Sequence, residues 1–105
     1  MAKGFKGPKG GDMMQQLQQL QQQIETTQAQ LAEETVTATV GGGVIKIEIT
    51  GDQRCKSVEI DASLLEDADV EMLQDLLLTA INSGLDKSRE MAADRLGPLA
   101  SGLPL

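Results

Sequence analysis

The side chains in this sequence that could bind a ligand are basic, and they occur in three groups. One group lies near the N-terminus, one just after residue 50, and one in the last fifth of the chain. The residues are Lys3, Lys6 and Lys9; Arg54 and Lys56; and Lys87 and Arg89. Ammonium and guanidinium groups neutralise phosphates and release the counterions condensed around a nucleic acid. The chemistry that these groups predict is therefore binding to a phosphate backbone.

Groups that could perform catalysis or hold a metal are scarce. The chain has no histidine and its single cysteine is Cys55, which excludes Cys/His zinc sites, Cys-His dyads and Ser-His-Asp triads. We interpret Cys55 as a reduced strand residue, with an interchain disulfide or a redox switch as the alternative. The glycines at 41–43 precede a strand pattern, whereas a phosphate loop needs a helix and a Lys-Ser pair. We predict no enzyme activity, metal, cofactor or small-molecule substrate.

Acidic residues outnumber basic residues, but their excess is local. The 105-residue chain has 16 acidic and 9 basic residues and a net charge of −7. Residues 59–75 form an acidic block without a single basic residue, made of Glu59, Asp61, Glu66, Asp67, Asp69, Glu71 and Asp75. The acids outside this block equal the basic residues in number. Most of the surface is therefore neutral on average, and its basic groups remain available for a polyanion.

The elements that must position these groups follow from the hydrophobic pattern. Residues 1–11 (MAKGFKGPKGG) are rich in glycine and lysine, and we expect a flexible basic arm that contacts a polyanion or, alternatively, serves only as a solubilising leader. A helix should begin at Asp12, with Gln15 completing a capping box. Its apolar positions form a narrow heptad seam that requires a partner helix. They are Met13, Leu17, Leu20, Ile24, Thr27 and Leu31.

Three short strands should follow this helix. The segments ETVTATV at 34–40 and VIKIEIT at 44–50 alternate with a period of two, and residues 55–60 form the third strand. Ile45, Ile47 and Ile49 should face the core of the sheet. The two short glycine-containing connections make this sheet an antiparallel meander.

A second long helix should begin after an acidic connection, capped by Asp67 or Asp69, and end at Gly97 and Pro98. Its apolar stripe is wide enough to cover the sheet and to contact another chain as well. Because a chain this short buries little surface alone, we expect a homodimer. Gly84 would allow another helix to approach closely. The residues predicted at the dimer interface are Leu73, Leu77, Ala80, Ile81 and Gly84.

The predicted fold class is therefore α+β: a long N-terminal helix, a three-stranded antiparallel meander and a long C-terminal helix. A single domain should span residues 12–96, between the arm at 1–11 and a flexible tail at 97–105. No apolar run approaches the length of about 18 residues needed to span a membrane, so we expect no membrane partner and a cytoplasmic location.

The triple-glycine turn, the Val/Ile strand with lysine and the second glycine turn are followed by VEIDASLLEDADVEMLQDLL and by Asn82. Together these features resemble the YbaB/EbfC family of bacterial nucleoid-associated proteins over residues 12–96. The resemblance implies a homodimer whose long helices project like tweezers from the sheets. It also implies a location in the nucleoid and binding to double-stranded DNA.

We therefore expect a nucleoid-associated protein that binds double-stranded DNA with low sequence specificity and compacts or bridges it. The contacts would come from the seven basic residues named first. Base stacking is not expected, because the only aromatic residue, Phe5, lies in the arm. The alternative is a protein-interaction module, in which the heptad seam forms a coiled coil or a chaperone-like clamp and DNA is not bound.

Overall fold

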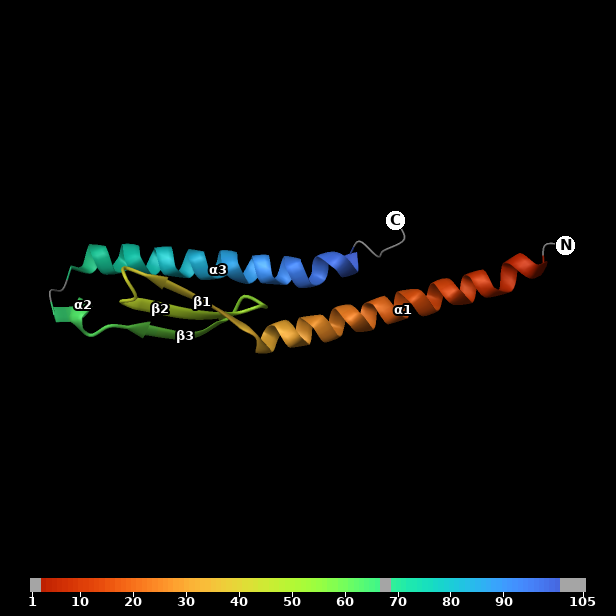
Figure 1. The fold of residues 1–105 in the computed structure, drawn as a ribbon, viewed down its shortest axis with the longest axis horizontal. Coiled ribbons are helices and arrows are strands. Elements are labelled where there is room, and N and C mark those ends of the chain that lie inside the picture. The colour runs from red at the N-terminus through yellow and green to blue at the C-terminus, as the bar shows by residue number, and fades with distance from the viewer. Residues whose placement is uncertain (1–2, 67–68, 101–105) are drawn as a thin grey trace.

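The computed structural model describes residues 3–66 and 69–100, with side chains described from residue 12 onward. Its elements are α1 (Lys3–Glu33), β1 (Thr35–Val40), β2 (Ile45–Thr50), β3 (Cys55–Ile60), α2 (Ser63–Glu66) and α3 (Val70–Ala100). The molecule is long and thin, with extents of 83 × 20 × 16 Å. One end holds the sheet with α3 laid over it, and α1 runs from the sheet toward the other end (Figure 1). The predicted α+β class and the order of the long helices and strands are confirmed.

The sheet is the predicted antiparallel meander, in the order β1-β2-β3. Alternation in β2 buries Ile45, Ile47 and Ile49 almost completely on one face. The glycine connection between β1 and β2 is a tight turn, in which the Gly43 N–H donates to the Val40 carbonyl at 3.1 Å. Gly41, Gly42 and Gly43 all have positive φ, a conformation that is accessible to glycine at little cost. The triple glycine therefore closes a hairpin, as predicted.

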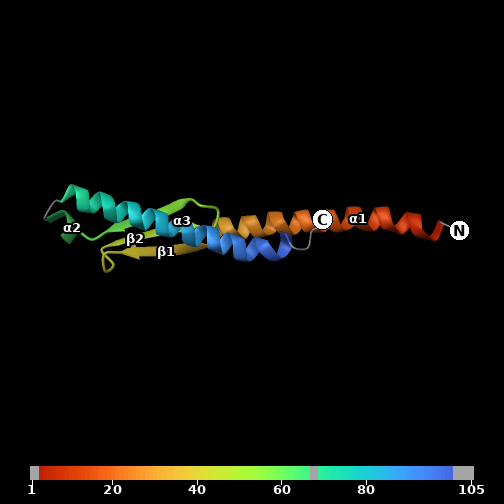
Figure 2. The same cartoon turned by 90° about the horizontal axis from the view of Figure 1, so that it is seen from above.

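Helix α3 covers the isoleucine face of the sheet, above β1 and β2 (Figure 2). Ala80 is completely buried against the three isoleucines. A Cβ atom on Gly84 would lie 2.8 Å from Cγ1 of Ile49, so only glycine allows α3 to approach the sheet this closely. One turn later the buried Ser88 hydroxyl donates to the Thr50 carbonyl at 2.7 Å. The glycine that we expected against another helix instead packs on the chain's own sheet.

Helix α1 is attached to the rest of the chain at its C-terminal end. Leu31 is its one buried residue among those with described side chains. The Gly51 N–H donates to the carbonyls of Leu31 at 2.8 Å and Glu34 at 3.0 Å. A Cβ on Gly51 would lie 2.8 Å from the Leu31 carbonyl oxygen, so this contact also depends on glycine. From this anchor α1 passes beside the last turns of α3 and then continues beyond them (Figure 1).

Both long helices are longer than predicted. Helix α1 begins at Lys3 and not at Asp12, so most of the expected flexible arm has a helical backbone. Extending an existing helix fixes one residue for each hydrogen bond gained, which is far less costly than nucleating one. Helix α3 continues through Gly97 and Pro98 to Ala100. Pro98 cannot donate to the Asp94 carbonyl, but this end of α3 lies beside α1, where Leu99 lines the same hollow as Leu17. Packing of this kind overrides local propensity.

The acidic connection before α3 contains the single-turn helix α2, which we did not predict. The Asp61 carboxylate accepts a hydrogen bond from the Ser63 backbone N–H at 2.9 Å, and this bond lowers the pKa of Asp61. Asp69 caps α3, because its Oδ1 accepts from the Met72 N–H at 3.1 Å. One of the two predicted caps is thus confirmed; the other, Asp67, lies outside the described residues.

Candidate nucleic-acid interface

The predicted DNA-binding residues lie in three separate places along the molecule. Lys3, Lys6 and Lys9 occupy the first turns of α1, and their side chains are outside those that the structure describes. From Lys9 to the anchor at Leu31, an α-helix rises by about 33 Å. Within one chain the fold therefore does not bring these lysines together with the basic residues of the sheet and of α3.

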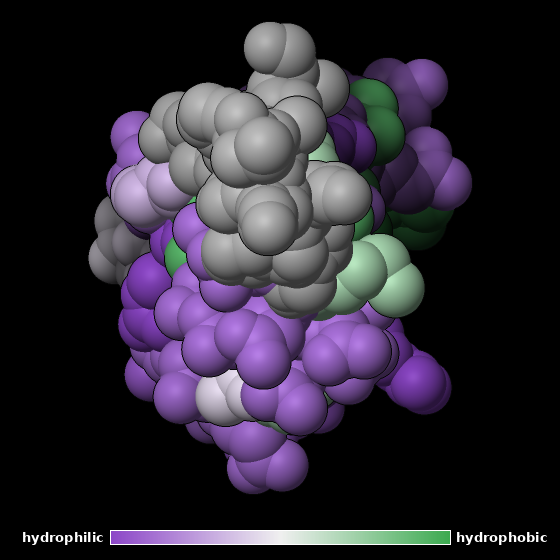
Figure 3. Space-filling view, turned by 90° about the vertical axis from the view of Figure 1, so that its right-hand side faces the viewer, coloured by the Kyte–Doolittle hydropathy of each residue, from purple (hydrophilic) through white to green (hydrophobic). Residues whose placement is uncertain are grey.

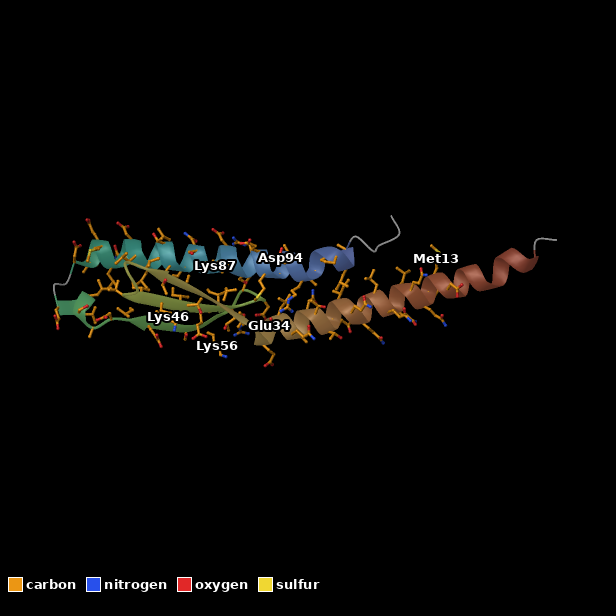
Figure 4. All side chains as sticks on the ribbon, viewed as in Figure 1. Met13, Glu34, Lys46, Lys56, Lys87 and Asp94 are labelled. Carbon is orange, nitrogen blue, oxygen red and sulfur yellow. The ribbon has the colours of Figure 1, made fainter. Side chains whose placement is uncertain are left out.

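The second group lies on the sheet. Arg54 is exposed at the start of β3, where its N–H donates to the Thr50 hydroxyl at 3.0 Å. The β2–β3 register shifts at Glu48, and Lys56 has no paired residue there. Figure 4 shows Lys56 on the side of the sheet away from α3. Both side chains are exposed, Arg54 in the turn before β3 and Lys56 on the outer face of the sheet.

Sequence reasoning missed Lys46, which alternation places on this same outer face. It lies opposite Glu59 in the register, and Glu48 accepts a hydrogen bond from the Ser57 hydroxyl at 3.2 Å nearby. The two lysines and two glutamates leave the outer face close to neutral. The outer face of the sheet is therefore a poor site for a strongly anionic partner. Its alternation with the buried isoleucines was a signal that could have identified Lys46.

The third group, on α3, is already engaged within the chain. Lys87 Nζ donates to the Thr37 carbonyl at 3.0 Å, on the open edge of β1. The Arg89 guanidinium pairs with Asp86 at 3.1 Å, and both side chains are more than half exposed. Such exposed pairs contribute at most about 1 kcal/mol, so a phosphate could replace Asp86. Lys87 also has a structural role, because from α3 it occupies a carbonyl of the edge strand β1 that could otherwise pair with another sheet.

Arg95 of α3, which sequence reasoning also missed, connects this helix to the residue that follows α1. Its guanidinium forms an ion pair with Glu34, the residue between α1 and β1. The two side chains are separated by 61 positions in the sequence. Arg95 does not belong to any of the three basic groups of the sequence. No spacing rule could have predicted this contact, since it depends on how α1 and α3 lie beside each other.

Charge is distributed unequally between the two ends of the molecule. The described members of the acidic block are exposed. They lie on β3, on α2, on the first turns of α3 and on the connections between them. The three lysines of α1 lie at the opposite end (Figure 1). Viewed from that end, the described surface is mostly hydrophilic, with few hydrophobic side chains (Figure 3). A polyanion would be repelled by the sheet end and attracted to the α1 end.

An uncovered apolar surface also lies at the sheet end. The register places Val58 and Ile60 of β3 on the same face as the buried isoleucines, but α3 packs mainly on β1 and β2. Val58 is 49% exposed and Leu78 of α3 is 60% exposed. We name the whole set the β3-side patch: Val58, Ile60, Leu65, Val70, Leu78 and Ile81. No part of the described chain covers this patch.

Four of the predicted dimer residues pack within the chain, and the fifth lies in the β3-side patch. Ala80 and Gly84 are buried in the chain's own core, and Leu73 and Leu77 pack partly buried against it. Their surface is largely used within the subunit, and their place in a dimer interface stays a prediction. In the sequence, the apolar side chains of α3 give the same pattern whether they pack within the chain or against a second chain. Ile81 differs, since it is 42% exposed and belongs to the β3-side patch.

No three His, Cys, Asp or Glu side chains in the described part of the chain are placed to hold a metal ion. The exposed Cys55 is a free thiol. The hollows along the described surface are shallow grooves, chiefly between α1 and the end of α3. None of the described helices is both long enough and apolar enough to cross a membrane.

Comparison with known proteins gives a consistent result. A "Nucleoid-associated protein" of Syntrophobacter fumaroxidans is 43% identical over 95 residues, covering 90% of this chain and 86% of that protein. One from Alkaliphilus metalliredigens is 38% identical over 105 residues, covering 96% and 92%. The crystal structure of uncharacterized protein HP0035 from Helicobacter pylori has a TM-score of 0.75 at 23% identity, over 84% of this chain and 92% of that one, which supports the fold.

The profile of the YbaB/EbfC DNA-binding family matches residues 6–103, nearly the whole chain and both long helices. The resemblance noted in the sequence is thereby confirmed. The chain belongs to the YbaB/EbfC DNA-binding family.

Proposed function

We propose that this protein binds double-stranded DNA as a homodimer in the bacterial nucleoid, with low sequence specificity, and compacts or bridges it. The observation that carries the proposal is the match of a DNA-binding family to nearly the whole chain. Relatives named as nucleoid-associated proteins, which match along most of their own length, support the location.

The charge distribution supports contact through the α1 end. Lys3, Lys6 and Lys9 have no acidic residue among them, whereas the outer sheet face is balanced and the α3 cations are engaged. A dimer would bring six such lysines, and about six phosphate contacts suffice for micromolar, salt-sensitive binding. We therefore assign most of the phosphate contacts to α1, with Arg54, Lys56, Lys87 and Arg89 as secondary contacts.

Low sequence specificity follows from the kinds of side chain available. Contacts to phosphates hold a protein on the duplex without reporting its sequence. Residues 12–33 of α1, whose side chains the structure describes, include glutamines and threonines but no basic or aromatic residue. Recognition would then depend on the shape and deformability of the duplex more than on base edges.

The homodimer is supported by the β3-side patch. Along one flank of α3, Leu78, Ile81, Leu85, Ala92, Leu96 and Leu99 follow heptad spacing. The C-terminal half of this flank lies against α1, since Ala92 and Leu96 share a hollow with Leu31. The N-terminal half, at Leu78 and Ile81, has no helix against it in the described chain. A second copy that covered this half would bury the β3-side patch and would continue the row of contacts along this flank of α3.

The DNA proposal is tested by duplex binding, measured by fluorescence anisotropy at several salt concentrations. We expect the affinity to fall steeply with salt, to differ little between unrelated duplexes, and to exceed that for the matching single strand. An absence of duplex binding even at about 50 mM salt would contradict the proposal.

The dimer proposal is tested by two matched charge substitutions on α3. Leu78→Glu places a carboxylate in the β3-side patch, whereas Met72→Glu does so in an acidic groove formed with Asp69 and Asp75. Both original side chains are exposed, at 60% and 44%. By light scattering we expect the first variant to be monomeric and the second to remain dimeric. A monomeric parent chain at micromolar concentration would refute the dimer.

The alternative function is a protein-interaction module built on α1. The observation in its favour is that Met13 and Leu17 of the heptad seam are 53% and 40% exposed. It predicts that the chain binds no duplex at low salt. It also predicts that polar substitution of the seam, and not loss of the lysines, abolishes its activity.

A further inference from the structure

Helix α1 has a stretch without charge where it leaves the rest of the molecule. Residues 13–24 contain no acidic or basic residue, although 24% of the chain is charged, and more than half of them are glutamine. Along this stretch α1 passes the end of α3 and continues beyond it (Figure 1). A polyanion would therefore meet many amide groups here and no charge of either sign.

Two faces of this stretch carry glutamines, because residues three and four apart lie on the same side of a helix. One set, which we name the outer row, is made of Gln15, Gln18 and Gln21. The other, which we name the groove row, is made of Gln16, Gln19 and Gln23. The outer row continues to Glu25, whereas the groove row continues to Thr26, Thr27 and Gln30. A phosphate would therefore meet a carboxylate along the first face and only hydroxyl and amide groups along the second.

The groove row faces the end of α3. Its three glutamines line a groove of about 370 Å³ together with Leu99 of α3. A second groove of about 410 Å³ adjoins the first, because Gln19, Gln23 and Leu99 line both, and it extends to Gln30. From Gln16 to Gln30 an α-helix rises by about 21 Å, which equals about six phosphate steps of 3.4 Å along one DNA strand. The two grooves together are long enough for a short length of phosphodiester backbone.

The side chains of the groove row can form new hydrogen bonds. All three are exposed, and their amide groups have no hydrogen-bond partner among the described residues. A primary amide has two N–H donors and one carbonyl acceptor but no charge. Glutamine N–H groups donate to the phosphate oxygens of DNA, and such contacts position a protein without reading the bases. The chemistry of this face therefore suits a nucleic-acid backbone.

We propose that the groove row binds the phosphate backbone of double-stranded DNA, beside the contacts made by the lysine end of α1. The inference rests on the proposed function, and it adds a second kind of contact to it. Because the amides carry no charge, their contacts release no counterions. They add an affinity that persists when salt weakens the lysine contacts.

The test compares two triple variants of the full chain by fluorescence anisotropy with a duplex at several salt concentrations. One carries Gln16→Ala, Gln19→Ala and Gln23→Ala, and the matched control carries Gln15→Ala, Gln18→Ala and Gln21→Ala. Alanine keeps the charge and favours helix at least as well as glutamine, so circular dichroism should show no loss of helix in either.

We expect the groove-row variant to bind the duplex about tenfold or more weakly than the parent chain, since hydrogen bonds to charged groups are the stronger ones. The loss should be the same at every salt concentration, because no charge has been removed. The outer-row variant should bind like the parent chain.

Duplex affinity that is unchanged in the groove-row variant, while the parent chain binds, would overturn this inference and leave the proposed function standing. An equal loss in both variants would overturn the assignment to the groove. A loss that is accompanied by a lower mass in light scattering would assign the groove to contact between copies of the chain, which also overturns the inference. A parent chain that binds no duplex would refute the proposed function itself.

Discussion

Helices α1 and α3 are both 31 residues long, yet they stand in opposite relation to the core. Three residues of α3 are fully buried, and it presses on the sheet through Ala80, Gly84 and Ser88. Helix α1 buries only Leu31 among its described side chains, and much of its length lies beyond the rest of the chain. The two helices therefore have different roles. Helix α3 packs on the sheet and forms the core, whereas α1 extends away from the core and exposes a surface to a partner.

The largest effect should come from a pair of matched isoleucines, one in the sheet beneath α3 and one on α1. Ile47→Ala removes a side chain that is completely buried under α3, which should lower the free energy of unfolding by about 2–5 kcal/mol. Ile24→Ala removes the same atoms from a partly buried site on α1 and should cost clearly less. Urea unfolding of both variants measures this difference. Equal losses would show that α1 contributes as much to the core as α3 does.

A glycine pair within α3 should give effects of opposite sign. Gly84→Ala places its Cβ 2.8 Å from Ile49 and should destabilise the protein by about 1–3 kcal/mol. Gly97→Ala meets no atom within 4 Å, so its higher helix propensity should stabilise the protein by up to about 1 kcal/mol. Thermal unfolding distinguishes the two. If Gly84→Ala were neutral, the close approach of α3 to the sheet would be refuted.

The smallest effect should come from the ion pair that connects the helices. Arg95→Gln removes the contact with Glu34, and because both side chains are 39% exposed we expect a loss of at most about 1 kcal/mol. The loss should vanish at about 1 M salt, where charges are screened. A loss that persists at high salt would mean that Arg95 acts through packing and not through its charge.

Local pattern was sufficient to predict much of this fold. The alternation of Ile45, Ile47 and Ile49 identified the buried face, the glycines at 41–43 identified the hairpin, and Asp69 was one of the two caps proposed. These features depend on neighbours in the sequence. Helices α1 and α3 were predicted too short, because glycine and proline propensities were weighed without helix propagation and without the packing of α3 beside α1.

The candidate site was harder to predict, since a surface contact depends on the whole arrangement. Gly84 was correctly recognised as a site of close approach, but the sequence could not tell a neighbouring helix from the chain's own strand. Lys87 and Arg89 were identified from charge alone, and only the fold reveals their contacts with Thr37 and Asp86. The exposure of Val58 and Ile60 arises because α3 leaves β3 uncovered, which no local pattern records.

The central claim, that α1 reaches DNA while the sheet and α3 provide the scaffold, is tested most directly by the salt dependence of duplex binding in two charge-matched variants. One carries Lys3→Gln, Lys6→Gln and Lys9→Gln; the other carries Lys46→Gln, Lys56→Gln and Lys87→Gln. For a dimer, we predict that the first set reduces the slope of log affinity against log salt by up to about 5, and the second by much less. An equal or larger reduction from the second set would contradict this account.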